Sequence, residues 1–294
     1  MKHLFIVNPV AGKGRGIAYM ETIKPLLEGK VDYSIEITNK RGEATEIVKK
    51  YTAKERCIVY AVGGDGTINE VVNGLIGTNS CLAIIPAGSG NDFIRTVYPK
   101  TINEDFVQKL LEGKKEAIDL IKVNDRYFLN IASVGIDAEV AYHATTFKKV
   151  KYMRGNLIYI MSILKTLWSH KSNQLKIELD GEINFDKKIL LLAVANGKYY
   201  GGGIPIAPSA SVNDAWAHVY MVKELKLRRI LQLIPKLFKA KHEKESDVEV
   251  YKAHQIHIQS NEKFRVNIDG EIIETNEVEM EVVPKALEVI IPAS

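Results

Sequence analysis

The strongest constraint on the fold is an alternation within residues 1–120, where short apolar runs are separated by segments with helical periodicity. The apolar runs are HLFIV, YSIEIT, CIVYAV and CLAIIP, and the helical segments lie near residues 17–27, near residues 43–51 and from residue 69 onward. Strand-length runs alternating with helices are typical of parallel strands joined by right-handed crossovers. We therefore expect an α/β domain with a parallel sheet.

Three glycine-containing segments directly follow strands of this predicted sheet. NPVAGKG follows the first run, GGDGT follows CIVYAV, and AGSGND follows CLAIIP. In a parallel sheet the loops at the carboxyl ends of the strands form the natural ligand crevice. The three segments are therefore expected to meet at one binding site.

The segment from Gly63 to Thr67 is the most informative because it lies between a strand and a helix. Its glycines let backbone N–H groups approach phosphate oxygens, the helix N-terminus favours anions, and Thr67 can donate a hydroxyl or cap the helix. Asp65 would be repelled by a phosphate unless a divalent cation lay between them, which indicates magnesium. A tight turn with Asp65 as an ordinary turn residue is the alternative.

The other two segments are weaker signals. Residues 8–14 match neither GxxxxGK(S/T) nor GxGxxG, so a plain glycine turn explains this segment in isolation, although Lys13 is placed to neutralise a phosphate. Ser89 in the third segment adds a hydroxyl, and Asp92 adds a second carboxylate. Three such loops at one crevice are hard to explain by structure alone.

From residue 121 the pattern changes to paired strands and turns, which predicts a largely antiparallel β-sandwich over residues 121–294. Asp180-Gly181 is a strong two-residue turn signal and Asn124-Asp125 a weaker one. One helix is expected near residues 150–168. The last apolar run, within residues 285–294, has two possible places: inside this domain or back in the first sheet.

Composition excludes several classes of protein. With 46% hydrophobic and 26% charged residues the chain is typical of globular proteins. Its longest apolar run, residues 189–195, is too short to span a membrane, and residues 1–9 lack the features of a signal peptide, so we expect a cytoplasmic protein. Cys57 and Cys81 are too few for a disulfide framework or a cysteine zinc site and are expected to be inert core thiols.

The segment from residue 223 to 244 contains eight Lys or Arg against two Glu. Its apolar residues recur at near-helical spacing, and Pro235 is expected to kink or divide the helix. Such a segment suits the surface of an anionic membrane, but a helix that covers the sandwich with a solvated charged face fits equally well. No motif supports nucleic-acid binding.

GGDGTINEVVNGL together with IIPAGSGNDFIR resembles the catalytic domain of the diacylglycerol kinase and sphingosine kinase superfamily, and the bacterial lipid kinase branch fits best. The resemblance extends over nearly the whole chain, through NPVAGKG, TNKRGEA, NIASVGIDAEV, RGNLIYI, ANGKYYGGGIPIAP and NIDGE. GGDGT also occurs in NAD kinases and phosphofructokinases. The GSGNDF segment and the stretch from GGG to DGE are what indicate a lipid kinase.

The resemblance implies a phosphofructokinase-like nucleotide domain, a β-sandwich domain, and ATP bound in the cleft between them. Ser89 stands where the family usually has Thr and keeps the hydroxyl. The candidate nucleotide-binding residues, including Lys13 for its charge, are Asn8, Pro9, Gly12, Lys13, Thr38, Gly63, Gly64, Asp65, Gly66, Thr67, Asn69 and Ser89.

The family's DGE motif implies a catalytic role for Glu271 as proton acceptor, beside Asp269. Phosphoryl transfer to an alcohol needs a group that takes the hydroxyl proton and a cation that neutralises the phosphate. Asp65, with Asp92 and Asp119 as weaker candidates, would organise Mg²⁺ and water. Without the resemblance, IDGE reads as a hairpin turn between FRVNI and EIIET.

A second metal site in the family precedes a strand, in a pattern resembling APxAxxxDGxxD. In this chain Ala215 replaces the glycine and His218 replaces the last acidic residue. The candidate ligands are Ser211, Asp214 and the carbonyl of Trp216. Because a hard cation prefers several oxygens, at least one or two of them charged, the expected affinity is low and an empty site is as plausible as an occupied one.

Together these features predict an ATP- and magnesium-dependent kinase that phosphorylates a hydroxyl of diacylglycerol or a related lipid at the cytoplasmic membrane surface. Two alternatives stay open: a kinase of NAD or another soluble metabolite, and a catalytically weak nucleotide-binding regulator. An edge strand of the sandwich would also allow a homodimer.

Overall fold

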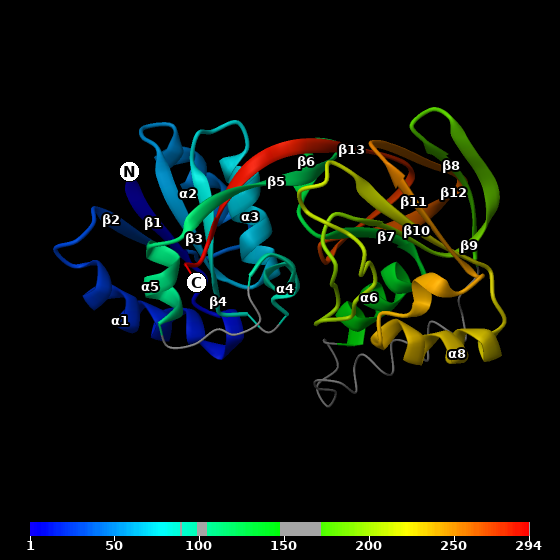
Figure 1. The fold of residues 1–294 in the computed structure, drawn as a ribbon, viewed down its shortest axis with the longest axis horizontal. Coiled ribbons are helices and arrows are strands. Elements are labelled where there is room, and N and C mark those ends of the chain that lie inside the picture. Colours follow the sequence, from blue (N-terminus) through cyan, green and yellow to red (C-terminus); the bar gives the residue numbers. More distant parts are fainter. Residues whose placement is uncertain (89, 99–104, 148–171, 294) are drawn as a thin grey trace.

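A computed structural model describes residues 1–88, 90–98, 105–147 and 172–293. Figure 1 shows two lobes, with both chain termini in the lobe drawn on the left. The long strand β13 (Glu271–Ile291) crosses the top of the molecule from one lobe to the other beside β5 (Lys114–Val123).

The N-terminal lobe contains a parallel sheet in the order β2-β1-β3-β4. Five of the six residues of β1 and all six of β4 are buried, as expected for parallel strands with both faces covered, which read as continuous apolar runs. The elements are β1 (Lys2–Val7), η1 (Ala11–Lys13), α1 (Arg15–Leu27), β2 (Tyr33–Ile37), α2 (Glu43–Thr52), β3 (Cys57–Gly63), α3 (Asp65–Leu75), β4 (Cys81–Pro86), α4 (Asp92–Val97) and α5 (Phe106–Leu111).

The C-terminal lobe is built mainly of antiparallel strands with two described α-helices. Its elements after β5 are β6 (Arg126–Phe128), β7 (Ile131–Gly135), α6 (Ile136–Phe147), β8 (Asn173–Leu179), β9 (Ile183–Ala195), β10 (Ala217–Lys223), α8 (Leu227–Phe238), η2 (His242–Lys244), β11 (Val248–Ala253), β12 (Gln255–Ile268) and β13. The helix expected near residues 150–168 lies outside the described residues. Among the helices that are described, none is long and apolar enough to cross a membrane.

The end of the chain returns to the first sheet. Val289 of β13 pairs in parallel with Leu82 of β4, and Ile291 pairs with Lys114 of β5. The register shifts between Val283 and Leu287, around a proline that lacks the N–H needed for a regular ladder. As a result the described strands of both lobes form one continuous hydrogen-bonded sheet.

Two hairpins differ in how well the sequence predicted them. Asp180 and Gly181 do form a turn, but the closing pair is Leu179 with Ile183, so the loop has three residues rather than the expected two. Asp269 and Gly270 form a two-residue turn with φ of 47° and 91°. Positive φ at both positions matches a type I′ turn. The DGE motif is therefore the tip of a hairpin, whatever else it does.

Pro235 was expected to kink or divide the basic helix, and it does not divide it. Helix α8 runs through Pro235, which lies on the exposed side where water can satisfy the carbonyl that loses its N–H partner. Leu233 is the buried residue of the helix, while Ile230 and Leu237 pack against an apolar cluster of the C-terminal lobe. Apolar side chains on both sides of the proline therefore attach the helix to the C-terminal lobe. The thiols of Cys57 and Cys81 are free and fully buried, as expected.

Candidate active site

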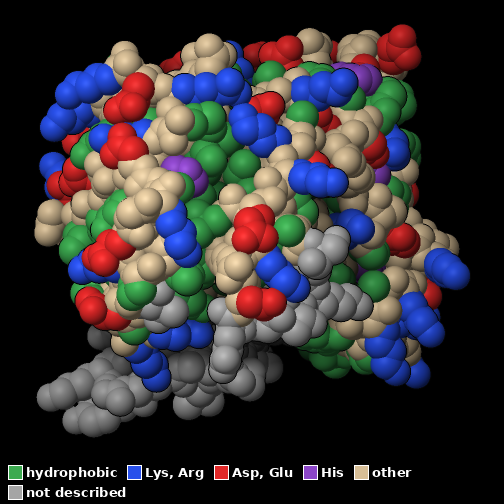
Figure 2. All heavy atoms as spheres, turned by 60° about the vertical axis from the view of Figure 1, so that its left-hand side comes forward, with side chains coloured by type: hydrophobic (Ala, Val, Ile, Leu, Met, Phe, Trp, Pro, Cys, Tyr) green, Lys and Arg blue, Asp and Glu red, His purple; other side chains and the backbone are tan. Residues whose placement is uncertain are grey.

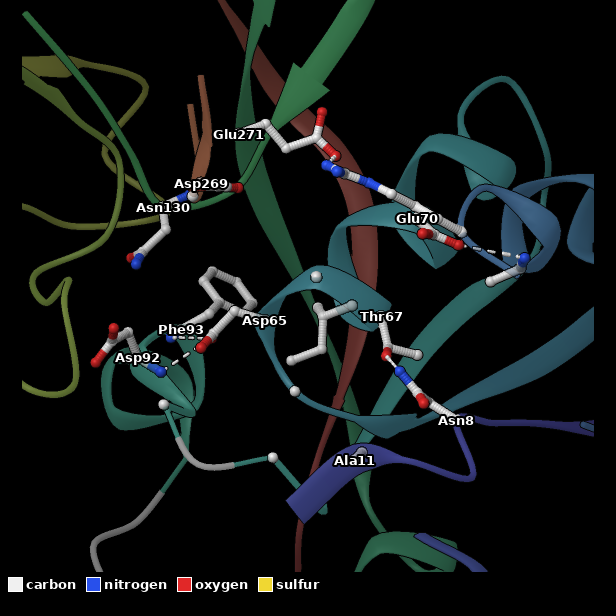
Figure 3. A pocket seen from close by; sticks show the side chains of 18 of the residues that line it. Asn8, Ala11, Asp65, Thr67, Glu70, Asp92, Phe93, Asn130, Asp269 and Glu271 are labelled. Carbon is white, nitrogen blue, oxygen red and sulfur yellow. Dashed lines mark hydrogen bonds and ion pairs between the residues drawn. The ribbon is translucent and has the colours of Figure 1, made fainter. Parts of the chain in front are cut away.

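A cleft of about 1110 Å³ lies between the two lobes. One wall is formed by the loops that follow β1, β2, β3 and β4, and the other by the segment before β7, the start of α6 and the β12–β13 hairpin. Figure 3 shows side chains from both walls around this space: Asp65 points towards the backbone of Asp92 and Phe93 on one side, and Asp269 and Glu271 lie on the other. The cleft therefore joins the two lobes in one site.

The glycine loops pack so closely that only glycine fits at their contact. A Cβ on Gly88 would lie 2.4 Å from the Cα of Gly64, whereas a Cβ on Gly66 would meet no atom within 4 Å. Asn8 Nδ2 donates to Thr67 Oγ1 at 3.0 Å, which ties the first loop to the second. The backbone N–H groups at the start of α3 consequently border the cleft, as an anion-binding helix terminus requires.

Asp65 and Asp92 lie next to each other at the base of the cleft. Asp65 Oδ1 accepts the backbone N–H groups of Asp92 at 2.9 Å and Phe93 at 3.3 Å, and so caps α4. Asp92 Oδ2 accepts the N–H of Gly202 at 2.8 Å, while its buried Oδ1 accepts no hydrogen bond from the described residues. Burial raises the pKa of both carboxyl groups. Two neighbouring carboxylates whose oxygens can accept further ligand bonds suit a hard divalent cation.

Asp269 holds the two walls together from behind the site. Its carboxylate accepts the N–H groups of Leu129 and Ile131, each at 3.0 Å, and of Asn130 at 3.2 Å. Asn69 Nδ2 of α3 also donates to it, at 3.1 Å. Burial raises the pKa of Asp269 to about 6. These contacts assign Asp269 an anchoring role and place Asn69 behind the cleft rather than on its wall.

Glu271 forms ion pairs with two arginines, one from each lobe. Arg126 Nη1 lies 2.7 Å from its Oε2, and Arg41 contacts its Oε1. In Figure 3 the carboxylate of Glu271 is turned towards the N-terminal lobe, where Arg41 reaches it. Partial burial raises the pKa of Glu271, but the hydrogen bonds from Arg126 and Arg41 outweigh it and hold the pKa below its usual range.

The structure brings most of the predicted nucleotide-binding residues to the cleft. Lys13 is exposed outside the lining, Asn69 lies behind it, and Gly63 is occupied with accepting the N–H groups of Ala87 and Gly88. Ser89 lies outside the described residues. The predicted residues that line the cleft are Asn8, Pro9, Gly12, Thr38, Gly64, Asp65, Gly66, Thr67 and Glu271.

Sequence reasoning missed several polar residues of the lining, above all Arg41 and Asp137. Asp137 is buried and hydrogen-bonded to Ser133, its Oδ1 has no described partner, and burial raises its pKa to about 7. The sequence feature that could have revealed Asp137 is a carboxylate just after the glycine that ends β7. Arg41 belongs to the loop after β2, so its position at a strand's carboxyl end was the available signal.

Asp119, expected as a weaker metal candidate, lies outside the cleft lining. Its oxygens accept the N–H groups of Ala215 at 2.7 Å and Lys285 at 2.8 Å. With only 2% of its surface exposed, it is a structural residue that holds two loops. Its place outside the cleft lining gives no support to the predicted role in organising magnesium.

The candidate second metal ligands Ser211, Asp214 and Trp216 also lie outside the cleft lining. Ser211 Oγ donates to Asn213 Oδ1 at 2.7 Å, and the backbone N–H of Trp216 donates to Asp214 Oδ1 at 3.2 Å. Partial burial raises the pKa of Asp214, but hydrogen bonds from Lys252 and His218 outweigh it and lower the pKa. The carboxylate is already engaged by the chain itself.

Comparisons with known proteins agree with this architecture. Residues 2–123 match the model of the diacylglycerol kinase catalytic domain, and residues 130–291 match that of the YegS C-terminal NAD kinase beta sandwich-like domain. The diacylglycerol kinase of Bacillus subtilis is 30% identical over 270 residues, which cover 90% of this chain and 88% of the relative. The chain belongs to the diacylglycerol kinase family of lipid kinases. Its C-terminal lobe is accordingly the NAD kinase-like β domain of this family.

Further members of the family show the same extent of similarity. The diacylglycerol kinase of Staphylococcus carnosus is 29% identical, covering 90% of this chain and 87% of that one. The crystal structure of a diacylglycerol kinase from Bacillus anthracis superposes with a TM-score of 0.74 at 29% identity and covers 98% and 96% of the two chains. The match to this kinase family is therefore global and includes both walls of the cleft.

Proposed function

We propose that the protein is an ATP- and magnesium-dependent lipid kinase that transfers the γ-phosphate to a hydroxyl of diacylglycerol or a related lipid. The observation that carries this proposal is the cleft, in which the loop of Gly64 to Thr67 faces the hairpin of Glu271. Residues 1–120, with the returning end of β13, would form the nucleotide domain, and residues 121–294 would form the domain that receives the lipid.

The phosphates of ATP would lie against the backbone N–H groups at the start of α3. A bound Mg²⁺ would be held by Asp65 and Asp92 and would neutralise charge on the phosphates. Asn8 positions Thr67 through their hydrogen bond, and Thr38 extends the same wall. The chain's own contribution is thus to orient the phosphates and to place two carboxylates beside them.

Glu271 is the proposed proton acceptor. It would take the proton of the lipid hydroxyl as that oxygen forms a bond to the γ-phosphorus and the bond from phosphorus to the β,γ-bridging oxygen breaks, with ADP as the leaving group. Arg41 and Arg126 hold Glu271 as a carboxylate, the form that can accept a proton. Arginine also binds phosphate oxygens well, so Arg41 is placed to contact the nucleotide.

Helix α8 supports the proposal that the lipid is met at a membrane surface. Its outer face exposes Leu227, Leu231 and Phe238, with 52%, 54% and 62% of their surfaces accessible. Figure 2 shows Lys and Arg side chains beside exposed apolar ones at its lower right, on the side of the molecule where α8 lies in Figure 1. An apolar stripe flanked by cations suits the interface of an anionic bilayer.

The basic residues of α8 fall into two groups. Arg229 pairs with Glu245 at 2.9 Å and Asp247 at 2.6 Å, so its charge serves the fold. Among the described residues, no carboxylate lies within ion-pairing distance of Arg228 or Lys239. The sequence pattern did not distinguish these groups. We therefore place the membrane contact on Arg228, Lys239 and the apolar stripe.

A direct assay tests the proposed reaction against its alternatives. Purified protein is given labelled ATP, Mg²⁺ and mixed detergent micelles containing diacylglycerol, monoacylglycerol, sphingosine, phosphatidylglycerol or NAD. We expect label in one lipid, loss of that label with Glu271→Gln, and no loss with the exposed control Glu277→Gln. Label in NAD would indicate a soluble-metabolite kinase, and ATP binding without transfer to any acceptor would indicate a regulator; either result contradicts the proposal.

A further inference from the structure

The loop before β10 carries Asp214, the remaining carboxylate of the family's second metal pattern. A divalent cation such as Mg²⁺ needs several oxygen ligands, and Asp214 would have to supply the charged ones. Its Oδ2 instead contacts Lys252 Nζ at 2.9 Å and His218 Nε2 at 3.0 Å. Its Oδ1 accepts the N–H of Trp216. Both oxygens have partners from the chain, so the donor set does not fit the metal.

Lys252 and His218 reach Asp214 because of the register of the sheet. The two residues are direct partners on the antiparallel strands β10 and β11, so their side chains project from the same face. His218, only 2% exposed, stands at the position of the missing acidic residue. Lys252 comes from the edge strand and brings its ammonium group to the same carboxylate oxygen.

The opposite side of this loop is fixed to the N-terminal part of the sheet. Asp119 of β5 accepts the N–H of Ala215, and its own N–H donates to the carbonyl of Val212 at 2.6 Å. Ala215 has a φ of 62°, the left-handed conformation for which the family pattern uses glycine. The loop therefore keeps its bend and is tied to β5 on one side and to β11 on the other.

We infer that the ammonium group of Lys252 replaces the divalent cation at this loop, so that the C-terminal lobe is held together without a second metal ion. A cation that bound Asp214 would have to displace Lys252 and His218 and would then lie beside a positive charge. One carboxylate and one ammonium also give the site no net negative charge to attract Mg²⁺. The inference concerns this loop alone and does not depend on the proposed reaction.

Thermal unfolding of the full chain without nucleotide provides the test. The change in melting temperature between EDTA and millimolar Mg²⁺ should agree within about 1 °C for wild type and Asp214→Asn, because no site couples Mg²⁺ to folding at this loop. Lys252→Ala should lower the melting temperature by about 1–3 °C, since a half-exposed ion pair is lost. Lys239→Ala removes an exposed lysine without a described ion pair and should leave it unchanged.

A second variant restores the family pattern. In Lys252→Ala/His218→Asp/Ala215→Gly we expect Mg²⁺ to raise the melting temperature and Mn²⁺ to bind in a calorimetric titration. Failure of the folded triple variant to gain this response would contradict the exclusion of metal by Lys252 and His218. Should the triple variant not fold, Asp214→Asn decides. If Mg²⁺ raises the melting temperature of the wild type and Asp214→Asn abolishes that rise, the inference is overturned. If the rise persists in Asp214→Asn, Mg²⁺ binds elsewhere and the inference is supported.

Discussion

Arg41 and Glu271 form an ion pair across the cleft, although they come from opposite lobes and are 230 positions apart in the sequence. Arg126 binds the other oxygen of the same carboxylate. A carboxylate held by two guanidinium groups is ionised at lower pH but is also a weaker base. If ATP phosphates draw Arg41 away, the basicity of Glu271 rises when the nucleotide is in place. The ion pair would thus couple nucleotide binding to the pKa of Glu271, the proposed base.

Replacing Arg41 should shift the pH profile of the kinase. Glu271 must be ionised to accept a proton, so the rate falls as pH drops through its pKa, and Arg41 helps to keep that pKa low. In Arg41→Gln the pKa rises, and the acid limb of kcat/KM should move to higher pH. Initial rates measured across the acidic range, with a saturating lipid, test this expectation.

The matched control is Lys49→Gln, which removes an exposed cation from the same lobe without touching the cleft. Its profile should coincide with that of the wild type. An acid limb that stays in place in both Arg41→Gln and Arg126→Gln would show that a group other than Glu271 sets it.

The sequence predicted those site residues whose position follows from local structure. Gly64 to Thr67 had to lie at the end of a strand and the start of a helix, and the topology of a parallel sheet brings such strand ends together. The Asp269-Gly270 turn was likewise recognisable as a hairpin from two residues. These features depend on neighbours in the chain, which is why a pattern detects them.

Contacts set by the register between distant strands could not be predicted in this way. The pairing of His218 with Lys252 depends on how β10 and β11 align, and a shift of one residue would turn both side chains to the other face. The family resemblance implied that Asn69 contacts the nucleotide, but in helix α3 its side chain donates to Asp269 instead. Side-chain direction and strand register are tertiary properties.

Two substitutions of Asp65 should distinguish its role in capping helix α4 from its proposed role in binding Mg²⁺. Asp65→Asn keeps an oxygen that can accept the N–H of Asp92, so stability should change little, whereas Asp65→Ala should cost about 1 kcal/mol for the lost cap. Both variants should lose kinase activity, by roughly 100-fold or more, because the charge is removed from both. Activity and urea unfolding measured on the same preparations test this. Full activity of Asp65→Asn would rule out a need for its charge.

Asp137 should make stability depend on pH. Its pKa is about 7 in the folded protein against about 3.9 for an unfolded aspartate, so the folded state retains a proton that the unfolded chain has lost. This contribution to the free energy of unfolding is fully present below pH 4 and is lost as pH rises to about 7. Asp137→Asn should therefore become more stable relative to wild type by up to roughly 4 kcal/mol over that range.

Denaturant unfolding at a series of pH values measures the difference, with Asp125→Asn in an exposed turn as the control. Parallel stability curves for wild type and Asp137→Asn would mean that Asp137 is ionised in the folded protein.

Helix α8 should bind anionic vesicles through its outer face. The double variant Leu231→Ser/Phe238→Ser removes two exposed apolar side chains. The double variant Arg228→Gln/Lys239→Gln removes two cations, each of which contributes roughly 1 kcal/mol of binding near an anionic surface. Both double variants should therefore sediment less with phosphatidylglycerol vesicles than the wild type. Only the charge variant should lose its difference from wild type at high salt, because salt screens charges and leaves apolar insertion unaffected. The matched control is Arg229→Gln, whose charge is already paired with Glu245 and Asp247; it should lower the melting temperature but not vesicle binding. Equal sedimentation of all three variants and the wild type would show that α8 only covers the C-terminal lobe.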